Sequence, residues 1–257
     1  ETGPLSGDGP GNTGMIDAGE KSFIIRMFHV HHNFGPKKAL IDITLDIAKN
    51  EFVFISGPSG AGKTTLLKLL YLGEPVSEGQ VLIDGINIAR IPRKKTPYLR
   101  RKFGVIFQDY KLIPTKSVYD NLALVLEAAG AKRRIIQKKV KHILRLVGME
   151  DRLKSFPPSL SGGEQQRIAV ARAIIGDPKI ILADEPTGSL DDESAEAILD
   201  LLRAAHIRGA TVIIATHDKA LMRKTGGHVL TLQQGRLETS AFLEKQYDDI
   251  ILKTGDR

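Results

Sequence analysis

A glycine-rich stretch between two apolar runs is the first candidate for chemistry in this sequence. GPSGAGKTT, residues 57–65, follows FVFIS and precedes LLKLLYL. It matches the pattern G-x-x-x-x-G-K-[ST] at Gly57, Gly62, Lys63 and Thr64. A curled backbone and a helix N-terminus direct N–H groups toward phosphate, Lys63 adds positive charge, and the Thr64 hydroxyl suits Mg²⁺. The stretch predicts a phosphate site made of Gly57, Pro58, Ser59, Gly60, Ala61, Gly62, Lys63, Thr64 and Thr65.

Two carboxylates follow an apolar run in KIILADEP, residues 179–186. Carboxylates are costly beside buried apolar residues unless they find partners or a ligand. At the carboxyl end of a parallel strand they reach the crevice where ligands bind. Asp184 is then the partner for magnesium, and Glu185 the group that orients or deprotonates an attacking water. The alternative is a pair of acids that merely ends a strand.

SLSGGEQQR, residues 159–167, predicts a second anion-binding helix start. Ser161 and Glu164 have the spacing of a capping box, and Gly162 with Gly163 leaves the exposed N–H groups accessible. A capping box alone is ordinary helix chemistry, so the glycines are what favour an anion. Because the chain then has two such helix starts for one nucleotide, we expect the second to serve a nucleotide held by another copy.

Three further polar residues at element ends are candidates that each have a structural alternative. Gln108 follows an apolar run, where its amide would reach the metal or the water, or would only cap the strand. His217 follows TVIIAT and would contact a terminal phosphate, or is a structural histidine. Asp191, in SLDD, fits a helix N-cap and is also a candidate dimer contact.

Hydrophobic patterns place these residues on an α/β fold. Partial alternation predicts an antiparallel layer, with strands over residues 23–30 and 39–47. Buried strands and intervening helices follow in the β-α-β order of a parallel sheet. The strands are expected at residues 51–56, 103–108, 179–184 and 211–216, and the helices at 62–72, 164–175 and 193–206.

Helix-period sequence over residues 117–147 predicts a helical lobe, about residues 110–175, inserted in the α/β core. HVLTLQQGRLETS is typical of a hairpin that turns at Gln234-Gly235. Residues 1–21, rich in Gly, Pro and acids, predict a flexible tail and are typical in part of residues added for expression. Residues 241–257 are expected to form a charged C-terminal helix.

Composition and charge limit the function classes. The 257 residues carry a formal net charge of +7 and no cysteine, which excludes disulfides and thiolate metal sites and fits a reducing compartment. No run approaches 18 apolar residues and the start lacks a secretory pattern, so we expect neither a membrane-spanning nor an exported protein. Two basic clusters, residues 90–102 and 132–145, are either solvated faces or a surface for anionic lipid or nucleic acid.

In order, GPSGAGKT, FQ, LSGGEQQ, ILADEPT, SLD and ATHD resemble the motifs of the nucleotide-binding domain of ABC ATPases, over about residues 22–240. The resemblance implies a P-loop NTPase fold that binds ATP and Mg²⁺ and hydrolyses ATP to ADP and phosphate. It implies a homodimer formed on ATP binding, in which Ser161, Gly162 and Gly163 close on the γ-phosphate held by Lys63 of the other copy.

The same resemblance assigns roles to the remaining candidates. Glu185 becomes the catalytic carboxylate and His217 the switch histidine, with Lys63 beside them. Magnesium would be held by Thr64, Gln108 and Asp184, and Glu164 and Asp191 join the nucleotide contacts. Phe34 falls where the family stacks an aromatic ring on adenine; its alternative is burial in the core.

Within that family, LYLGEPVSEGQVLIDG and FGVIFQDYKLIPTKSVYDNLAL are similar to the FtsE group of cell-division ATPases. The likeness implies an FtsX-like integral membrane subunit, docked between core and lobe near Tyr110 to Leu112. It also implies an indirect effect on the cell-wall hydrolase machinery. The chain would then be cytoplasmic and peripheral on the inner face of the plasma membrane, through its membrane partner.

Three other classes of protein are alternatives to this interpretation. Lipoprotein-release and macrolide-type exporter ATPases share SLSGGEQQR and ADEPTG, so an exporter subunit is the alternative. A DNA-repair ABC ATPase would carry a long coiled-coil insertion that this sequence lacks, so a nucleic-acid partner is not expected. A nucleotide-binding adaptor that seldom hydrolyses is disfavoured because Glu185 and His217 are both present.

Overall fold

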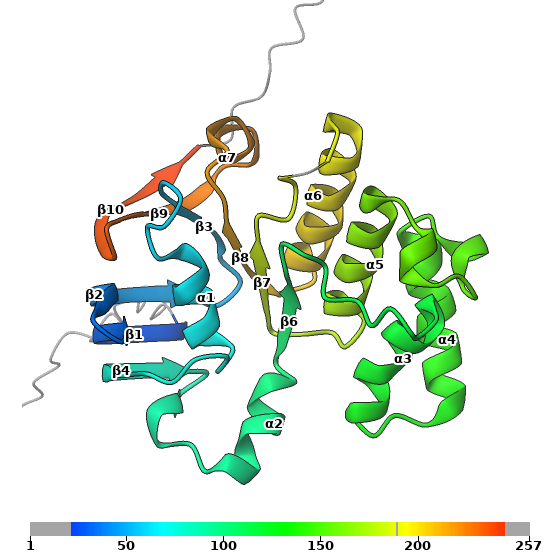
Figure 1. Cartoon of the computed structure of the whole chain (residues 1–257), viewed down its shortest axis with the longest axis horizontal. Coiled ribbons are helices and arrows are strands. Elements are labelled where there is room, and N and C mark those ends of the chain that lie inside the picture. Colours follow the sequence, from blue (N-terminus) through cyan, green and yellow to red (C-terminus); the bar gives the residue numbers. More distant parts are fainter. Residues whose placement is uncertain (1–21, 189, 245–257) are drawn as a thin grey trace, which may run out of the picture.

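The computed structural model describes residues 22–188 and 190–244 of the chain. These residues form two sheets with helices between and beside them (Figure 1). Within the described residues, no helix combines the length and the apolar character needed to cross a membrane. The α/β fold class predicted from the sequence, with its antiparallel layer and helical lobe, is confirmed.

A six-stranded sheet, with strand order β10-β9-β3-β8-β7-β6, forms the centre of the molecule. β3, β6, β7 and β8 run parallel to one another, β9 is parallel to β3, and β10 returns antiparallel to β9. The strands are β3 (Phe52–Ser56), β6 (Phe103–Ile106), β7 (Ile180–Asp184), β8 (Thr211–Ala215), β9 (Gly227–Gln233) and β10 (Arg236–Leu243). The carboxyl ends of the parallel strands therefore meet at one edge of the sheet, where ligands bind in α/β folds.

Both faces of the central sheet are covered. On β3 the side chain of Phe54 belongs to one core cluster, while Val53 and Ile55 belong to the other, because alternate residues of a strand point to opposite faces. α1 (Lys63–Leu70) packs in the cluster shared with the antiparallel sheet. α5 (Gly162–Ile174) and α6 (Asp192–Ile207) pack on the other face, and two short helices, α2 (Thr96–Arg100) and α7 (Lys219–Thr225), lie at the periphery.

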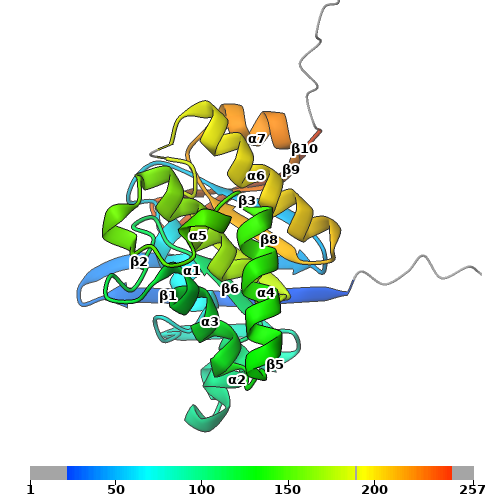
Figure 2. The same cartoon turned by 90° about the vertical axis from the view of Figure 1, so that its right-hand side faces the viewer.

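The helical lobe is inserted between β6 and β7 and consists of α3 (Val118–Ala128), α4 (Arg133–Leu146) and α5. Figure 2 shows α3 and α4 in front of α5, on the side away from the antiparallel sheet. α3 begins with a capping box in which Ser117 and Asp120 exchange bonds. Asn121, buried to 1% exposure, accepts from the Ile113 N–H and donates to three carbonyl groups of residues 113–117, so the segment entering the lobe is fixed to α3.

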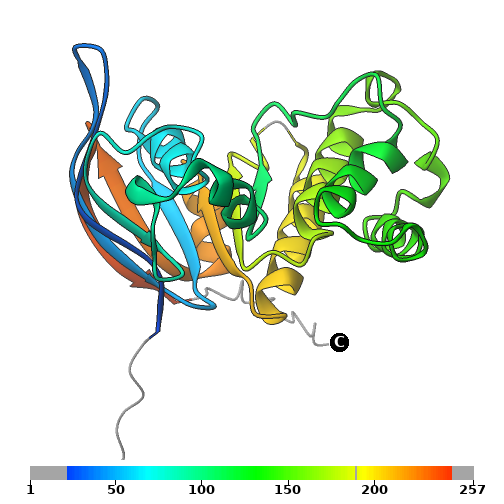
Figure 3. The ribbon, with the colours of Figure 1, turned by 90° about the horizontal axis from the view of Figure 1, so that it is seen from below.

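The antiparallel sheet lies on the side of the molecule opposite the helical lobe (Figure 3). Its order is β2-β1-β4-β5, with β1 (Phe23–Phe34), β2 (Lys37–Ala48), β4 (Glu78–Ile83) and β5 (Ile86–Asn87). β1 and β2 are longer than the alternation indicated. Register shifts interrupt the pairing of these strands, and His29 and Asp42 have positive φ angles of 48° and 56°. Such irregularities break strict alternation, which explains why the sequence pattern was only partial.

The prediction of a C-terminal helix over residues 241–257 is wrong for residues 241–243. Residues 241–243 continue β10 and pair with β9, so the domain does not end at residue 240. Phe242 stacks on His228 with ring centroids 4.5 Å apart, and His228 Nδ1 lies 2.7 Å from Glu51 Oε1. These contacts and the strand pairing outweigh the local preference for helix in a charged segment. Residues 245–257, and the predicted tail over residues 1–21, lie outside the described residues.

Candidate active site

The loop between β3 and α1 contains two glycines at which a side chain would collide with neighbouring backbone. Gly57 has φ 144°, and a Cβ there would lie 2.2 Å from the Leu232 carbonyl oxygen. Gly62, the N-cap of α1, has φ 110°, and its Cβ would lie 2.8 Å from the Ala39 carbonyl oxygen. The loop is thus pressed against β9 and β2, and L-residues rarely adopt these backbone angles. The backbone can therefore curl around an anion at the start of α1.

Lys63 places its ammonium group inside this loop. The side chain is buried, and Nζ donates to the carbonyl oxygens of Gly57 at 2.7 Å and Pro58 at 3.2 Å. Nζ also lies 3.9 Å from Glu185 Oε1. A buried cation needs such partners because desolvation without them is costly. The positive charge is consequently held between the phosphate loop and the carboxylate that follows β7.

Asp184 ends β7, and its carboxyl group is perturbed by its surroundings. Burial raises the pKa of Asp184, and a hydrogen bond from the Thr64 side chain opposes that shift. The adjacent Glu185 carboxylate raises the pKa of Asp184 further, whereas the Lys63 and Lys68 cations lower it. A carboxylate that is costly to ionise without a cation nearby is suited to binding a metal ion.

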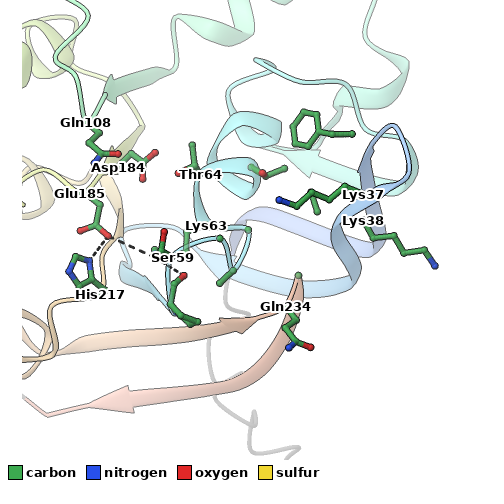
Figure 4. A pocket seen from close by; sticks show the side chains of 18 of the residues that line it. Lys37, Lys38, Ser59, Lys63, Thr64, Gln108, Asp184, Glu185, His217 and Gln234 are labelled. Atoms are coloured by element: carbon green, nitrogen blue, oxygen red, sulfur yellow. Dashed lines mark hydrogen bonds and ion pairs between the residues drawn. The ribbon is translucent and has the colours of Figure 1, made fainter.

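Glu185 is held by consecutive residues at the end of β8, and Figure 4 shows the contact with His217. Its φ is 45°, and its N–H donates to the Ala215 carbonyl oxygen at 2.9 Å. Thr216 Oγ1 donates to Glu185 Oε2 at 3.1 Å, and His217 Nδ1 lies 2.8 Å from Glu185 Oε1. The carboxylate is 14% exposed, while the His217 side chain is 73% exposed. Glu185 therefore sits in a fixed position at the floor, with His217 at the solvent side.

These residues border a single cavity of about 790 Å³, within the usual range for small-molecule sites. Figure 4 shows its polar side chains, which come from the loop after β3 and the start of α1, from segments that follow other strands and from the β1-β2 hairpin. The cavity is lined by Phe34, Lys37, Lys38, Ala39, Pro58, Ser59, Gly60, Ala61, Gly62, Lys63, Thr64, Thr65, Gln108, Asp184, Glu185, Gly188, His217, Gln234 and Gly235.

The expected magnesium ligands fit their task. Thr64, Gln108 and Asp184 all line the cavity, and the Thr64 side chain is hydrogen-bonded to Asp184. A hydroxyl, an amide and a carboxylate supply oxygen donors, which Mg²⁺ prefers, and Mg²⁺ takes few protein ligands alongside water and substrate oxygens. No cluster of three or more His, Cys, Asp or Glu side chains able to hold a metal occurs among residues 22–188 and 190–244. The donor set favours a hard cation shared with a phosphate.

The capping box predicted at Ser161 and Glu164 is formed at the start of α5, away from the cavity. Ser161 caps α5, accepting from the Glu164 N–H at 3.2 Å while Glu164 Oε2 accepts from the Ser161 N–H at 2.8 Å. The hydrogen bond from the Ser161 backbone lowers the pKa of Glu164. Gly162 and Gly163 occupy the first turn. None of these residues borders the cavity around Lys63.

Asp191 is likewise outside that cavity and caps α6. Its Oδ1 accepts from the Ser194 N–H at 2.8 Å, and this bond lowers the pKa of Asp191. The N-cap expected from the sequence is therefore formed. Near it, a Cβ on Gly163 would lie 3.4 Å from Ser194 Oγ, so the first turns of α5 and α6 are neighbours.

Comparison with known families decides the identity of this arrangement. The family model described as ABC transporter matches residues 40–188, which include the phosphate loop, Gln108, the α5 start and Glu185. The chain belongs to the ABC transporter family. As a member of it, the chain is an ATPase, and the predicted ATP-hydrolysing activity is confirmed.

Individual relatives extend the likeness over most of the ABC domain. The cell division ATP-binding protein FtsE of Streptococcus pneumoniae is 42% identical over 212 residues, covering 82% of this chain and 92% of the relative. FtsE of Escherichia coli is 44% identical over 215 residues, covering 83% and 97%. A dimeric post-hydrolysis structure of the ATP-binding cassette MJ0796 with ADP and Pi has a TM-score of 0.80 at 33% identity, covering 86% of this chain and all of that one. The prediction of an ABC ATP-binding protein that resembles FtsE is confirmed.

Several cavity residues of this ABC ATPase escaped prediction. Lys37 and Lys38, both exposed, line the cavity beside Phe34, which is 44% exposed and so is not a core residue. Gln234 and Gly235 were recognised as a hairpin turn only. They reach the cavity because the Ile41 N–H donates to the Gly235 carbonyl oxygen and the Gly235 N–H to that of Ala61. The closeness of Lys37 and Lys38 to Phe34 in sequence was the available signal for the two lysines.

Proposed function

We propose that the chain is the ATP-binding and ATP-hydrolysing subunit of an FtsEX-like membrane complex in cell division. The observation that carries the proposal is the set Lys63, Glu185 and His217, brought from three separate segments to one cavity beside a glycine-shaped phosphate loop. The FtsE relatives, similar over most of their length, support the cell-division role.

ATP and Mg²⁺ are the proposed ligands. Thr64, Gln108 and Asp184 would hold the ion, which when bound neutralises charge on the phosphate oxygens. Lys63 and the N–H groups at the start of α1 bind the phosphates, and Phe34, which lines the cavity and is partly exposed, stacks on the base. Lys63 then exchanges its bonds to the Gly57 and Pro58 carbonyl groups for bonds to phosphate.

Glu185 is the proposed catalytic carboxylate. Its carboxylate accepts from Thr216 Oγ1, which leaves it oriented toward the cavity, where it can align a water or accept its proton. His217, whose Nδ1 is 2.8 Å from Glu185 Oε1, is largely exposed and can turn its ring between this carboxylate and a terminal phosphate. Lys63 draws the phosphate toward the same point.

A second copy is proposed to complete each site. The start of α5 at Ser161, Gly162 and Gly163 does not border the chain's own cavity, so it can close on a γ-phosphate bound by a partner chain. Because the Ser161 N–H is bonded to Glu164, the backbone N–H groups proposed for this contact are those of Gly162 and Gly163. Because each nucleotide then contacts both copies, ATP draws them together and hydrolysis releases them. The dimeric assembly of the MJ0796 cassette supports this arrangement.

The proposed output is motion of the helical lobe against an FtsX-like integral membrane subunit, with an indirect effect on cell-wall hydrolases. Tyr110 and Lys111 have positive φ angles of 60° and 49°, and Arg172 of α5 donates to both of their carbonyl groups. Leu112 packs against the lobe core. A partner bound to this turn is thereby linked to α5, and the chain would be peripheral on the inner face of the plasma membrane through that partner.

The Glu185→Gln variant tests the catalytic assignment. It should bind ATP, dimerise more stably and hydrolyse little, because the amide cannot accept a proton while the fold around it is preserved. Turnover equal to the parent's would remove Glu185 from its role. Mass spectrometry of the integral membrane protein that copurifies separates the cell-division complex from a lipoprotein or macrolide exporter, which would bring a different subunit.

A further inference from the structure

Gln166 on α5 bonds to the turn that carries Glu185. Its side chain is 2% exposed, and Nε2 donates to the Pro186 carbonyl oxygen at 2.6 Å. Pro186 is itself buried and directly follows Glu185. The side-chain amide of Gln166 therefore joins α5, the helix capped by Ser161, to the residue that follows the proposed catalytic carboxylate.

Backbone hydrogen bonds hold the turn that follows β7. Glu185 has a positive φ of 45°, its N–H donates to the Ala215 carbonyl oxygen, and its own carbonyl accepts from the Gly188 N–H at 3.3 Å. Pro186 has no N–H to contribute. In the described part of the chain, the Gln166 amide is the partner recorded for the Pro186 carbonyl group. This bond consequently links the peptide after Pro186 to α5.

The other half of the Gln166 amide is not satisfied. Oε1 is buried and has no hydrogen-bond partner among the described residues. An unpaired buried acceptor costs free energy, and an apolar side chain of the same shape would remove this acceptor while leaving the Pro186 carbonyl oxygen unpaired in its place. Stability alone therefore does not favour glutamine at this position. The side chain does, however, provide a directional link that an apolar one cannot.

We propose that Gln166 is a positioning residue that couples the start of α5 to the orientation of Glu185. The inference rests on the proposed catalytic role of Glu185 and on the proposed docking of a partner's phosphate at Ser161 to Gly163. A small shift of α5 when that phosphate binds is passed through the Gln166 amide to the Pro186 carbonyl group. The residues with which a chain completes its partner's ATP site are thereby connected to the Glu185 carboxylate in the chain's own site.

The adjacent residue offers a matched control. Gln165 Nε2 also donates to a backbone carbonyl group, that of Leu160 at 3.1 Å, on the side leading into the helix. Gln165 and Gln166 thus share residue type, helix and kind of bond, and they differ in which segment they hold. A loss specific to Gln166 is a loss of the link to Glu185.

The first experiment compares Gln166→Met with Gln165→Met in the full chain. Methionine preserves shape and removes the donor. Gln166→Met exchanges one unpaired buried acceptor, its own Oε1, for another, the Pro186 carbonyl oxygen, so its Tm should stay near the parent's. We expect kcat to fall at least about tenfold with KM for ATP unchanged, because small displacements of a catalytic group are costly. Gln165→Met should keep the parent kcat, and equal losses in both variants would overturn the proposal.

The second experiment places Gln166→Met in the Glu185→Gln background and measures single-turnover hydrolysis. If Gln166 acts through Glu185, the residual rate should be the same with and without Gln166→Met, since coupled residues are non-additive. If the double variant instead loses rate by the product of the two separate factors, Gln166 does not act through Glu185 and the positioning role is rejected. The Glu185→Gln variant alone separates the two proposals: parent-like turnover defeats the catalytic assignment, whereas low turnover with an unaffected Gln166→Met defeats only the coupling.

Discussion

Lys63 Nζ lies 3.9 Å from Glu185 Oε1 and closer still to two carbonyl oxygens of its own loop. The phosphate-binding cation and the proposed catalytic carboxylate therefore lie next to each other at the cavity. A terminal phosphate that binds beside them meets both an attractive charge and a group able to align water. The same closeness means that removing either charge changes the field at the other.

Replacement of Lys63 by methionine tests its part in phosphate binding. Methionine keeps most of the buried volume and removes the charge-assisted bonds to phosphate. We expect ATP affinity to fall by about 2 kcal/mol, a factor of about 30 in Kd, as measured by fluorescence of a labelled nucleotide. Lys68→Met, on the same helix but outside the cavity lining, is the control. Equal affinity in the two variants would contradict the assignment.

Thr216 is predicted to set the orientation of Glu185. Its side chain is buried, and Oγ1 donates to Glu185 Oε2 while accepting from the Asp218 N–H at 3.1 Å. Thr216→Val keeps the shape but loses both bonds, so kcat should drop about tenfold with KM nearly unchanged. Thr216→Ser, which retains the hydroxyl, should recover most of the rate. Failure of serine to recover it would indicate that packing, not the bond, matters.

Asp184→Asn is predicted to separate stability from ligand binding. Because burial raises the pKa of Asp184, the folded chain binds a proton there more readily than the unfolded chain, and ionisation at pH 7 lowers stability. The asparagine variant should accordingly have a Tm at least as high as the parent's without ligand. It should also lose the rise in Tm that Mg²⁺ and ATP together cause in the parent.

The control for this variant is Asp177→Asn. Asp177 pairs with Lys139 on the surface of the lobe, away from the cavity lining. It should leave the Tm rise caused by Mg²⁺ and ATP intact. A full ligand-induced rise in Asp184→Asn, measured by differential scanning fluorimetry, would exclude Asp184 as a magnesium ligand.

The sequence predicted those cavity-lining residues that lie just after the ends of strands. Gln108, Glu185 and His217 each follow an apolar run, and parallel strands bring such positions to one edge of the sheet. Local signals were also sufficient for the caps at Ser161 and Asp191, because a cap needs only residues within one turn.

Features that depend on contacts between distant segments were not predictable. The bond from Gln166 to Pro186 joins residues 20 apart, and Gln234 reaches the cavity only because the β9-β10 turn packs on β2. α7 has seven residues and escaped recognition because so short a segment has little periodicity. The β9-β10 hairpin was predicted as far as residue 240, but β10 is mostly exposed, and pairing with β9 extends the strand to residue 243 where a helix was expected.

Asp84 is predicted to contribute stability that depends on pH. Hydrogen bonds from Lys102 and Lys179 lower the pKa of Asp84 to about 2. A carboxyl group with a lowered folded pKa stabilises the folded state above its unfolded pKa, and this contribution disappears as the pH falls through the folded value. Asp84→Asn should lower the free energy of unfolding by about 1 kcal/mol at pH 7, after allowance for solvent screening of the lysines.

Urea unfolding of the parent and Asp84→Asn at several pH values checks this prediction. The difference between them should be constant above about pH 5 and should shrink between about pH 4 and pH 2, where Asp84 becomes protonated in the unfolded and then in the folded chain. A difference that does not change over that interval would mean that the two lysines do not hold the charged form of Asp84.

Gly163→Ala is predicted to separate folding from dimer formation. A Cβ at Gly163 would make ordinary contacts, 3.4 Å from Ser194 Oγ and 3.9 Å from Leu190 Cδ2, and alanine favours the helix more than glycine does. The variant should therefore fold with a Tm at or above the parent's. The added methyl group lies at the start of α5, where a partner's phosphate must approach the backbone, so ATP-dependent dimerisation of the Glu185→Gln protein should be lost.

Light scattering with and without ATP measures this loss, and Gly57→Ala supplies the contrast. At Gly57 the Cβ would lie 2.2 Å from a backbone oxygen of β9, so that substitution should prevent stable folding and not merely dimerisation. The two glycines thus serve different needs: Gly57 allows the loop to pack on its own domain, whereas Gly163 keeps a helix end open to a second chain. Normal ATP-dependent dimers in Gly163→Ala would show that the backbone there is not approached by a ligand.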